Sequence, residues 1–480
     1  MNRRMVLNTV GHIILAEAAL LLLPAIVSVI YLEKCVWAFL ITIGIALALG
    51  LILKFASRPD NKVIYAKEGF VIVTYAWVLM SAIGALPFVI SGEIPNFVDA
   101  FFETVSGFTT TGASILTDIE SMSHGILFWR SFTHWIGGMG VIVFVMAIIP
   151  NISDRSMNIM KAEVPGPTVG KLVPKARDTA KILYLIYIGM TIIMIVMLLA
   201  GGMPLFDSIV HTFGTAGTGG FGIKSSSIGG YSAYCQWVIT AFMLLFSLNF
   251  NLYYLILMRK FKSVLKSTEL WFFLGLVAVS IAVITIDISS MYSTFSETIR
   301  TSSFQVATII STTGYATANF NTWPSLSKAI LMMLMIVGGC AGSTAGGLKN
   351  ARVVMLVKTV HRELKKMLHP RSVRAVSMED KRVDEQTLSG VTSYFAIYAM
   401  CIVAIFVLLS IEPFGIETNL SATLACFNNV GPGFGAVGPI GNYAEYSIFS
   451  KLLLSFAMLM GRLEIFPLIL GLNPLVWKRR

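Results

Sequence analysis

The sequence predicts an all-α polytopic membrane protein, and three observations support that fold class. The composition is strongly apolar, apolar runs are long enough to span a bilayer, and one arrangement of segments occurs four times. That arrangement is a long helix, a short helix, a glycine loop and a second long helix. Four such units are therefore predicted around one pore, with an N-terminal helix pair outside them.

The composition places the chain in a membrane. Of its 480 residues, 56% are hydrophobic and 13% are charged, and the mean hydropathy is +0.77. One soluble core would not bury that much apolar surface. Runs of about 20 apolar residues cross roughly 30 Å of hydrocarbon, and we count about ten of them. The first run extends to Tyr31, which is too long for a signal peptide and predicts a retained helix.

The four glycine loops are the elements that recur most clearly. They lie at residues 108–114, 217–222, 311–315 and 429–435. Each follows a segment too short to cross the membrane, and these short helices are predicted at 96–108, 204–216, 295–310 and 418–428. Close packing of small residues between helices would explain a single loop. Four loops with matched flanking segments favour a pore instead.

The charge pattern predicts the orientation. The net charge is +11, and basic clusters fall at every second connection, at 1–4, 54–67, 155–181, 259–266, 349–382 and 478–480. By the positive-inside tendency these connections and both termini are cytoplasmic, and all four glycine loops face outward. The units then run in the same direction, as a ring around one axis requires and an inverted repeat does not.

The same pattern divides the chain. Residues 1–68 form the N-terminal extension, with helices at 8–31 and 37–55, and the four units occupy 69–178, 179–268, 269–386 and 387–480. The cytoplasmic connections at 151–178 and 361–386 mix proline, glycine and charge, and they are too short to form separate domains.

Glycine loops at membrane depth are suited to a monovalent cation. Glycine allows a positive φ that turns carbonyl groups toward a common axis, and it has no side chain to block that axis. Backbone without internal hydrogen bonds is tolerated there when it lines an ion path. Carbonyl rings suit K⁺, and the loops contain no acidic ring for a divalent ion. The candidate ligand residues are Thr110, Thr111, Gly112, Gly217, Thr218, Gly219, Thr312, Thr313, Gly314, Asn429, Val430 and Gly431.

A candidate gate lies nearer the cytoplasm. Residues 337–347, called here the intramembrane stretch, break the second helix of the third unit, since glycines disfavour a continuous helix. Arg462 lies about fifteen residues into the last helix, roughly 22 Å from its outer end. We expect Arg462 to bond to carbonyl groups of this stretch and hold the gate. Helix packing for the stretch and snorkelling for Arg462 are the alternatives. The candidate gate glycines are Gly338, Gly339, Gly342, Gly346 and Gly347.

Other chemistry is weakly indicated. Arg130 and His134 are expected to be interfacial anchors or packing groups rather than ligands, and the five cysteines show no metal-binding or paired spacing. Residues 342–349 look faintly like a phosphate loop, but Leu348 stands where the lysine is required. No enzyme activity, organic cofactor or nucleic-acid partner is predicted.

Three segments carry a family resemblance. They are FWRSFTHWIGGMG at 128–140, GSTAGGLK at 342–349 and GRLE at 461–464. With the N-terminal helix pair, they make nearly the whole chain resemble the TrkH branch of the Trk/Ktr/HKT superfamily of potassium transporters. The resemblance implies that Gly112, Gly219, Gly314 and Gly431 are the filter glycines and that Arg462 is the pore arginine.

The resemblance also implies function and partners. It implies channel-like uptake of K⁺, and of Rb⁺, across the inner (cytoplasmic) membrane of a bacterium, by a homodimer embedded in membrane lipids with one pore per subunit. It further implies a TrkA-like cytosolic nucleotide-binding regulatory subunit that moves the intramembrane stretch. The basic connections at 161–181 and 349–382 suit such a partner, although insertion polarity also explains their charge.

Two points stay open. The second loop has Gly217 where the first and third have threonine, and the fourth has Asn429 and Val430, so the preference for K⁺ over Na⁺ is not fixed by the sequence. The alternative function is a symporter that couples K⁺ to H⁺ or Na⁺. It requires a coupling group near the membrane centre, where Glu17 and Glu464 are the candidate carboxylates.

Overall fold

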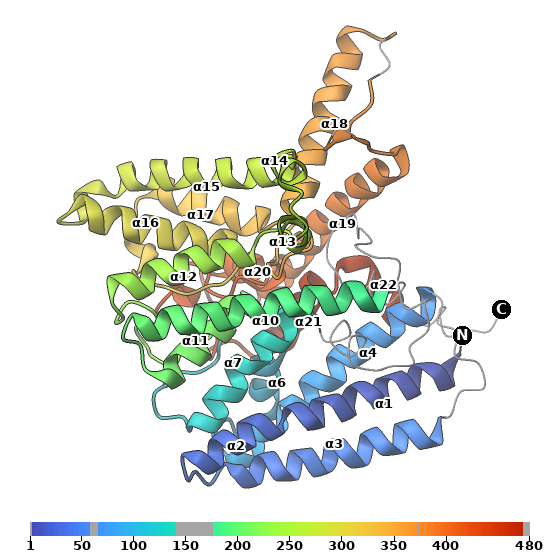
Figure 1. Ribbon diagram of the computed structural model, residues 1–480, viewed down its shortest axis with the longest axis vertical. Coiled ribbons are helices and arrows are strands. Elements are labelled where there is room, and N and C mark those ends of the chain that lie inside the picture. Colours follow the sequence, from blue (N-terminus) through green and yellow to red (C-terminus); the bar gives the residue numbers. More distant parts are fainter. Residues whose placement is uncertain (1, 58–65, 141–175, 372–373, 380, 474–480) are drawn as a thin grey trace.

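The structure is a computed structural model that describes residues 2–57, 66–140, 176–371, 374–379 and 381–473. The regular secondary structure of these residues is helical apart from one antiparallel hairpin, β1 (Ser377–Met378) and β2 (Lys381–Arg382). Figure 1 shows the long helices lying roughly parallel to one another, with α18 extending from the body. Most of the predicted connection at 151–178 and the basic residues 478–480 lie outside the described residues.

The N-terminal extension is a helix pair, as predicted. Its first helix bends at Leu21 into α1 (Arg3–Leu20) and α2 (Leu22–Ile30), and α3 (Val36–Ala56) returns beside it (Figure 1). Two glycines allow this close approach: a Cβ atom added to Gly11 would lie 3.0 Å from the carbonyl oxygen of Gly50. Small residues at such contacts are the usual means of packing helices in a bilayer.

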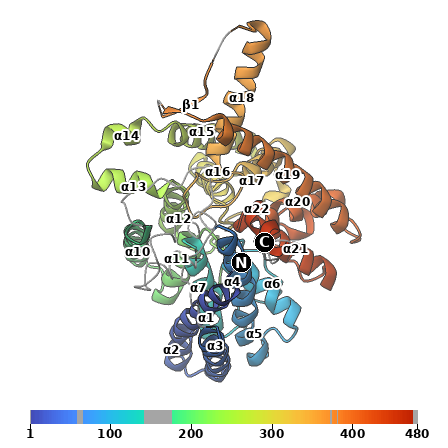
Figure 2. The ribbon, with the colours of Figure 1, turned by 90° about the vertical axis from the view of Figure 1, so that its right-hand side faces the viewer.

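The four units follow one another around the molecule. Figure 2 shows the first unit in blue and cyan, the second in green, the third in yellow and the fourth in red, arranged around a common centre. The first long helices are α4 (Ala66–Gly84) with α5 (Leu86–Ser91), α10 (Ala176–Ala200), α15 (Thr268–Asp287) and α19 (Glu385–Leu409). The second are α7 (His124–Gly138), α12 (Ala233–Phe246) with α13 (Phe250–Leu257), α17 (Ser325–Val337) and α21 (Ile448–Arg462) with α22 (Ile465–Leu472).

The short helices lie where the sequence predicts them, within two residues at each end. We call them the pore helices: α6 (Phe97–Phe108), α11 (Leu205–Gly217), α16 (Phe295–Ile310) and α20 (Ile416–Phe427). Two of them start at side-chain caps: Asn96 accepts a hydrogen bond from the Val98 amide at 2.8 Å, and Thr294 accepts one from the Glu297 amide at 3.3 Å. Such caps satisfy amide groups that the first helical turn leaves free.

In the part of the chain that the structure describes, uninterrupted spans are fewer than the ten or so predicted for the whole sequence. By length and composition, six helices in the described part of the chain are able to cross a membrane, and two sharply bent pairs raise that number to eight. The sequence indicated about ten because it treats each second helix as continuous. In the structure α7 has 15 residues before the undescribed segment begins at 141, and α17 has 13 residues before the intramembrane stretch.

Short connecting elements complete the chain. Single 3₁₀ turns lie at Ser289–Met291, Phe320–Thr322 and Gly435–Val437, and α14 (Phe261–Leu265) joins the second unit to the third. Beyond the intramembrane stretch, α18 (Asn350–Leu368) leads to the hairpin. The largest apolar core joins the N-terminal pair to the first and fourth units, whereas the second and third units have cores of their own.

Carboxylates hold the outer ends of three second helices. Ser123, Ser327 and Ser447 lie at the starts of α7, α17 and α21, and each donates its hydroxyl and its amide to one acid at 2.5–3.2 Å. The acids are Glu93, Asp287 and Glu412, each at or just after the end of the first long helix of its unit. We call these pairs the outer clamps. They were not predicted, because the partners lie about thirty or more residues apart.

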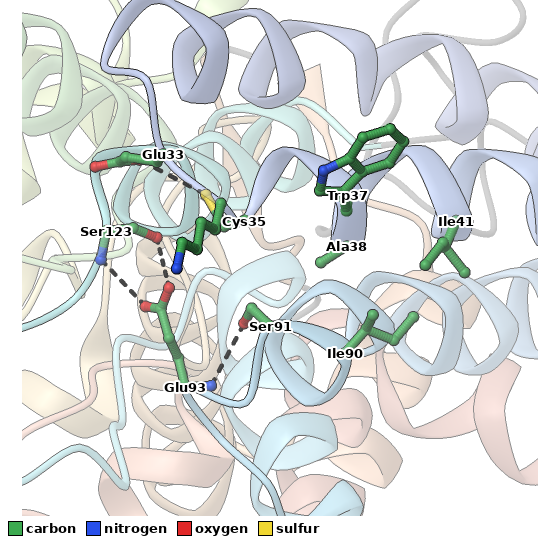
Figure 3. Close-up of a pocket in the computed structure, with 10 residues that line it drawn as sticks. Glu33, Cys35, Trp37, Ala38, Ile41, Ile90, Ser91, Glu93 and Ser123 are labelled. Carbon is green, nitrogen blue, oxygen red and sulfur yellow. Dashed lines mark hydrogen bonds between the residues drawn. The ribbon is translucent and has the colours of Figure 1, made fainter.

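The outer clamp of the first unit lies beside a pocket of about 550 Å³ (Figure 3). Glu33 and Glu93 both reach the start of α7, where Glu33 accepts from the amides of His124 and Gly125 at 2.7 and 3.0 Å. The two carboxylates differ in ionisation. Burial raises the pKa of Glu93, and the charge of Glu33 adds to this rise. Burial acts to raise the pKa of Glu33 as well, but the hydrogen bonds from Gly125 and His124 outweigh burial, so the pKa of Glu33 is lowered.

Candidate functional site

Each pore helix ends in the same backbone turn. The residue after the turn donates its amide to the carbonyl five positions earlier: Thr111 to Ser106 at 2.8 Å, Gly219 to Gly214 at 2.7 Å, Thr313 to Thr308 at 2.8 Å and Val430 to Ala425 at 2.8 Å. The preceding residue bonds three positions back in every case. This bond pair is a Schellman motif, which normally requires glycine in the left-handed conformation.

Here that left-handed residue is not glycine in any of the four turns. Thr110, Thr218, Thr312 and Asn429 have φ of 55°, 57°, 56° and 56°. A β-branched residue in this conformation is a true outlier and costs roughly 1–3 kcal/mol. Such strain is retained when the surroundings impose it, and it is concentrated at functional sites. The three strained threonines, and Asn429 in a conformation that asparagine tolerates, therefore mark one backbone feature repeated in the four loops.

The four glycine loops close into a ring, which we call the loop ring. A Cβ added to Gly112 would lie 2.0 Å from the carbonyl oxygen of Gly219, in the second loop. A Cβ added to Gly220 would lie 1.9 Å from the carbonyl oxygen of Thr313. One added to Gly314 would lie 2.2 Å from that of Val430, and one added to Gly431 would lie 2.5 Å from that of Thr111. Each loop thus touches the next in the order one, two, three, four and back to one. Only glycine fits at these four positions, because any side chain would displace a neighbouring carbonyl.

The loop ring corrects the alignment of the second loop by one residue. The sequence analysis placed Gly217, Thr218 and Gly219 opposite the other triplets and took Gly219 as the filter glycine. In the structure Gly217 is the last residue of α11, and Gly220, with φ of 77°, occupies the position of Gly112. Three glycines in four residues allow both alignments, so only the backbone geometry distinguishes them. The corrected triplet is Thr218, Gly219 and Gly220.

Gly219 is small because a histidine fills the space behind it. A Cβ on Gly219 would lie 2.3 Å from the ring of His134, whereas the first and third loops have threonine at this position. His134 is fully buried, and it contacts the carbonyl of Gly107 at 2.7 Å through Nδ1 and accepts from the Phe221 amide at 3.3 Å through Nε2. It therefore holds the first and second loops together.

Arg130 also supports the loops. It is 2% exposed, forms a 2.6 Å ion pair with Glu103 and donates to the carbonyl of Gly222 at 2.9 Å. Glu103 in turn accepts from the Ile115 amide at 3.0 Å. Of the two roles expected for Arg130 and His134, packing is correct and interfacial anchoring is wrong, because both side chains are buried behind the loops.

The intramembrane stretch lies against the inner side of the loop ring. The amide of Gly346 donates to the hydroxyl of the strained Thr312 at 2.6 Å, and that of Gly347 donates to the carbonyl of Asn428 at 3.1 Å. Gly338, Gly342 and Gly347 have φ between 69° and 79°, which explains why glycines occur there. Gly339 packs against Ala345, its added Cβ lying 2.5 Å away.

Both ends of this stretch are tied together. The amides of Leu348 and Lys349 donate to the carbonyls of Ile336 and Val337 at 2.9 and 3.0 Å. Glu269, at the start of α15, accepts from the amides of Ala341 and Ala351 at 2.6 and 3.0 Å. Sequence analysis did not single out Glu269. The feature of the sequence that could have pointed to Glu269 is an acidic residue at the start of an apolar helix.

Arg462 links three of the four units. Nη1 donates to the carbonyl of Thr344 at 2.8 Å, as expected for a bond to the intramembrane stretch. Nη2 donates to the carbonyls of Gly137 and Gly138 at 2.5 and 2.6 Å, which the sequence analysis did not foresee. Arg462 is 5% exposed, so snorkelling to the membrane surface is wrong.

Second helices are interrupted in the second and fourth units too. α12 and α13 meet at 91° around Ser247 to Asn249, and α21 and α22 meet at 118° around Leu463 and Glu464. The intramembrane stretch fits into the first break, where the Cys340 amide donates to the Ser247 carbonyl at 2.9 Å. Neither break contains glycine or proline, the residues that usually mark a helix kink, so neither break was predicted.

Glu464 has a partner that the sequence did not indicate. It forms an ion pair with Arg352 of α18, whose guanidinium lies 3.9 Å over the ring of Tyr394. Glu464 therefore does not lie free in the pathway as a coupling group. The pair joins the third unit to the fourth.

These features define a class: a multi-pass membrane protein whose four similar units bring four backbone loops to one centre, above a single arginine. The chain belongs to the TrkH family, since residues 36–474 match that family, described as a cation transport protein. This is a family of transport proteins and not of enzymes.

Relatives of known name cover the full chain. The Trk system potassium uptake protein TrkH of Salmonella typhimurium (strain LT2) is 36% identical, and that of Escherichia coli (strain K12) is 35% identical, each over 100% of both chains. The crystal structure of the potassium transporter TrkH from Vibrio parahaemolyticus matches with a TM-score of 0.89 and 30% identity, covering 100% of both chains.

Proposed function

We propose that this protein takes up K⁺, and also Rb⁺, across the inner membrane of a bacterium through a channel-like path lined by carbonyl groups. The observation that carries the proposal is the loop ring, in which four non-identical loops meet in cyclic contact. Carbonyl oxygens arranged around an axis replace the water shell of a dehydrated alkali ion. The Trk potassium uptake proteins to which the chain is similar support K⁺ as the ion.

The ligands in this proposal are the carbonyl groups of the four triplets. They are Thr110, Thr111 and Gly112, Thr218, Gly219 and Gly220, Thr312, Thr313 and Gly314, and Asn429, Val430 and Gly431. Gly217 leaves the set, because it belongs to α11. The C-terminal ends of the pore helices point toward these triplets, and helix dipoles favour a cation there. The chain divides at residues 68, 178, 268 and 386 into the extension and four pore units.

We place the gate at the intramembrane stretch and Arg462. The guanidinium lies below the loop ring and binds carbonyls of the first and third units, so in this arrangement its charge opposes a passing cation. Opening then requires the stretch to leave its contacts with Thr312 and Asn428. The glycines of the stretch permit the backbone change that this movement needs.

Both termini are cytoplasmic in this proposal, and the protein is a homodimer with a TrkA-like cytosolic nucleotide-binding regulator. α18 supports a partner, because it extends beyond the body in both views (Figures 1 and 2). Its exposed apolar residues Val357, Val360, Leu364 and Met367 are spaced three and four residues apart. That spacing forms one stripe along a helix, as in a coiled-coil seam.

The test is ⁸⁶Rb⁺ uptake into liposomes with Na⁺ as competitor, comparing the native chain with Gly314→Ser. A Cβ at Gly314 would lie 2.2 Å from the Val430 carbonyl oxygen, so we expect discrimination against Na⁺ to be lost. Gly275→Ser is the matched control in the same unit, since nothing lies within 4 Å of that position. Equal discrimination in the native chain and Gly314→Ser would remove the loops from the selectivity mechanism.

A further inference from the structure

The N-terminal helix pair contains a buried carboxyl group that the proposed pathway does not use. Glu17 of α1 is 1% exposed, and neither of its oxygens has a hydrogen-bond partner within the described ranges. An ionised carboxylate without a partner is strongly unfavourable in a membrane interior. The neutral, protonated form is therefore the form that this packing accommodates.

The facing helix carries two further polar groups in the same state. Nε1 of Trp77 and the hydroxyl of Ser81, both on α4, are buried and also lack a partner among the described residues. With Gly84 they occupy one face of α4, at spacings of four and three residues. Gly84 faces Glu17, because a Cβ added there would lie 3.3 Å from Glu17 Oε1. Glu17 therefore meets α4 at Gly84, about one and two helical turns away from Ser81 and Trp77.

This interface reaches the first pore helix. The same Cβ on Gly84 would lie 2.9 Å from Thr104 and 3.0 Å from the ring of Phe108, both on α6. The Gly84 carbonyl also accepts from Trp129 Nε1 of α7 at 2.9 Å. Phe108 is the last residue of α6 and the first of the loop at 108–114, so Gly84 connects Glu17 with the start of the first glycine loop.

The charged groups on the surrounding helices have other contacts or lie at helix ends. Asp99 and Glu103 of α6 pair with Lys451 and Arg130, and Glu68 of α4 accepts from the Asn2 amide. The remaining titratable groups of α1, α3 and α4 in the described ranges are Arg3, Arg4, His12, Lys54, Lys67 and Tyr75. None of the hydrogen bonds or ion pairs described for this region involves the Glu17 carboxyl group.

We propose that Glu17 is a proton-binding site that couples pH to the first pore helix. With the proton bound, α1, α4 and α6 pack as described. Loss of the proton leaves a charge that must be hydrated, which separates α1 from α4 and withdraws support from α6 at Gly84. K⁺ uptake then falls. The uptake readout rests on the transport function proposed above, but the proton site itself does not.

Two measurements on the full chain in liposomes test this. The first is ⁸⁶Rb⁺ uptake at equal internal and external pH, from pH 6 to pH 9. We expect uptake by the native chain to fall about fivefold toward pH 9 and uptake by Glu17→Gln and Glu17→Leu to stay at the acid value. The second is infrared absorption of a protonated carboxyl group, which the native chain should show at pH 7 and Glu17→Gln should lack.

Thr42→Val is the matched control for disturbing the helix pair. Thr42 of α3 is buried, and its hydroxyl bonds only its own helix, at the Ala38 carbonyl, among the bonds described. Uptake by the Thr42→Val variant should show the same dependence on pH as uptake by the native chain. The same fivefold fall in Glu17→Gln, or no difference in carboxyl absorption between the native chain and Glu17→Gln, would overturn the proposal. A carboxyl signal in a chain that transports no Rb⁺ would instead refute the transport function.

Discussion

The loop ring and the helix breaks beneath it differ in how similar their four parts are. In the loop ring every unit supplies the same turn, a left-handed residue other than glycine at the same position, and the same glycine contact. Beneath it, the second helices end in different ways: α7 ends at Gly138, two helix pairs bend by 91° and 118°, and α17 opens into a long stretch. In the proposed pore, equivalence is needed where four carbonyl sets meet one ion, whereas a movable gate needs to occur only once.

The strongest test of this difference is a methyl group added inside the loop ring. Gly220→Ala places a Cβ 1.9 Å from the Thr313 carbonyl oxygen and puts a side chain at φ of 77°. We expect ⁸⁶Rb⁺ uptake to fall about a hundredfold, because an ångström-scale displacement of a ligand has effects of that size. The control is Gly222→Ala in the same loop, where the nearest atom is 3.7 Å away. Similar losses in both variants would contradict the corrected alignment.

A change beneath the loop ring should act in the opposite direction. Arg462→Ala removes the three bonds to Thr344, Gly137 and Gly138, so the closed arrangement loses its stabilisation. We expect uptake without a regulator to rise about tenfold, the effect of roughly 1.4 kcal/mol. Arg462→Lys, which keeps the charge but not the planar fork, should fall between the two. Unchanged or lower uptake in correctly inserted Arg462→Ala protein would exclude the gate.

Removing the hydrogen bond between the loop ring and the intramembrane stretch should have a smaller effect on uptake. Thr312→Val removes the hydroxyl that accepts from the Gly346 amide, while its strained backbone is kept by a β-branched residue. The loss of one hydrogen bond, about 1 kcal/mol, should raise unregulated uptake about fivefold. Thr312→Ser restores the acceptor and should return uptake to the native level. A Ser variant that resembles the Val variant would show that the bond plays no part in gating.

The outer clamps should give the smallest effect. Burial of the Glu412 carboxylate acts to raise its pKa. The hydrogen bonds from Ser447 and Ser450 and the charge of Lys451 outweigh burial, so the pKa of Glu412 is lowered. The folded protein thus binds this proton less readily than the unfolded chain, so the clamp stabilises above about pH 4 and is lost below it. Glu412→Gln should lower the free energy of unfolding by about 0.5 kcal/mol at pH 7.

The measurement for this clamp is thermal unfolding in detergent at several pH values. The difference between native protein and Glu412→Gln should disappear as the pH falls below about 4. A difference that grew on acidification would reverse the sign and contradict the lowered pKa of Glu412.

Sequence reasoning located the loop ring better than the level beneath it. Short amphipathic helices before glycine loops have a strong local pattern, so the pore helices were found to within two residues. The second loop was misaligned because the sequence does not distinguish Gly217, Gly219 and Gly220 as the glycine that contacts the next loop. The contact between Gly220 and Thr313 identifies it.

The breaks in the second and fourth units were missed for a different reason. The residues of the two breaks, 247–249 and 463–464, include no glycine or proline, and the first break has a long-range hydrogen bond from Cys340 to Ser247 that no local pattern reveals. The partners of Arg462 on α7 were missed similarly, since more than 320 positions separate Gly137 and Gly138 from the arginine.

In the proposed gate, the three carbonyls held by Arg462 imply that permeation switches abruptly. The guanidinium of Arg462 donates to backbone carbonyls of two units, the first and the third. Because the group is planar and rigid, releasing one unit before the other would leave a buried N–H donor without an acceptor. Intermediate, half-conducting arrangements are therefore penalised. Single-molecule current records should show two levels, and the ligand that unlocks the pathway should change how often the upper level is visited but not its height.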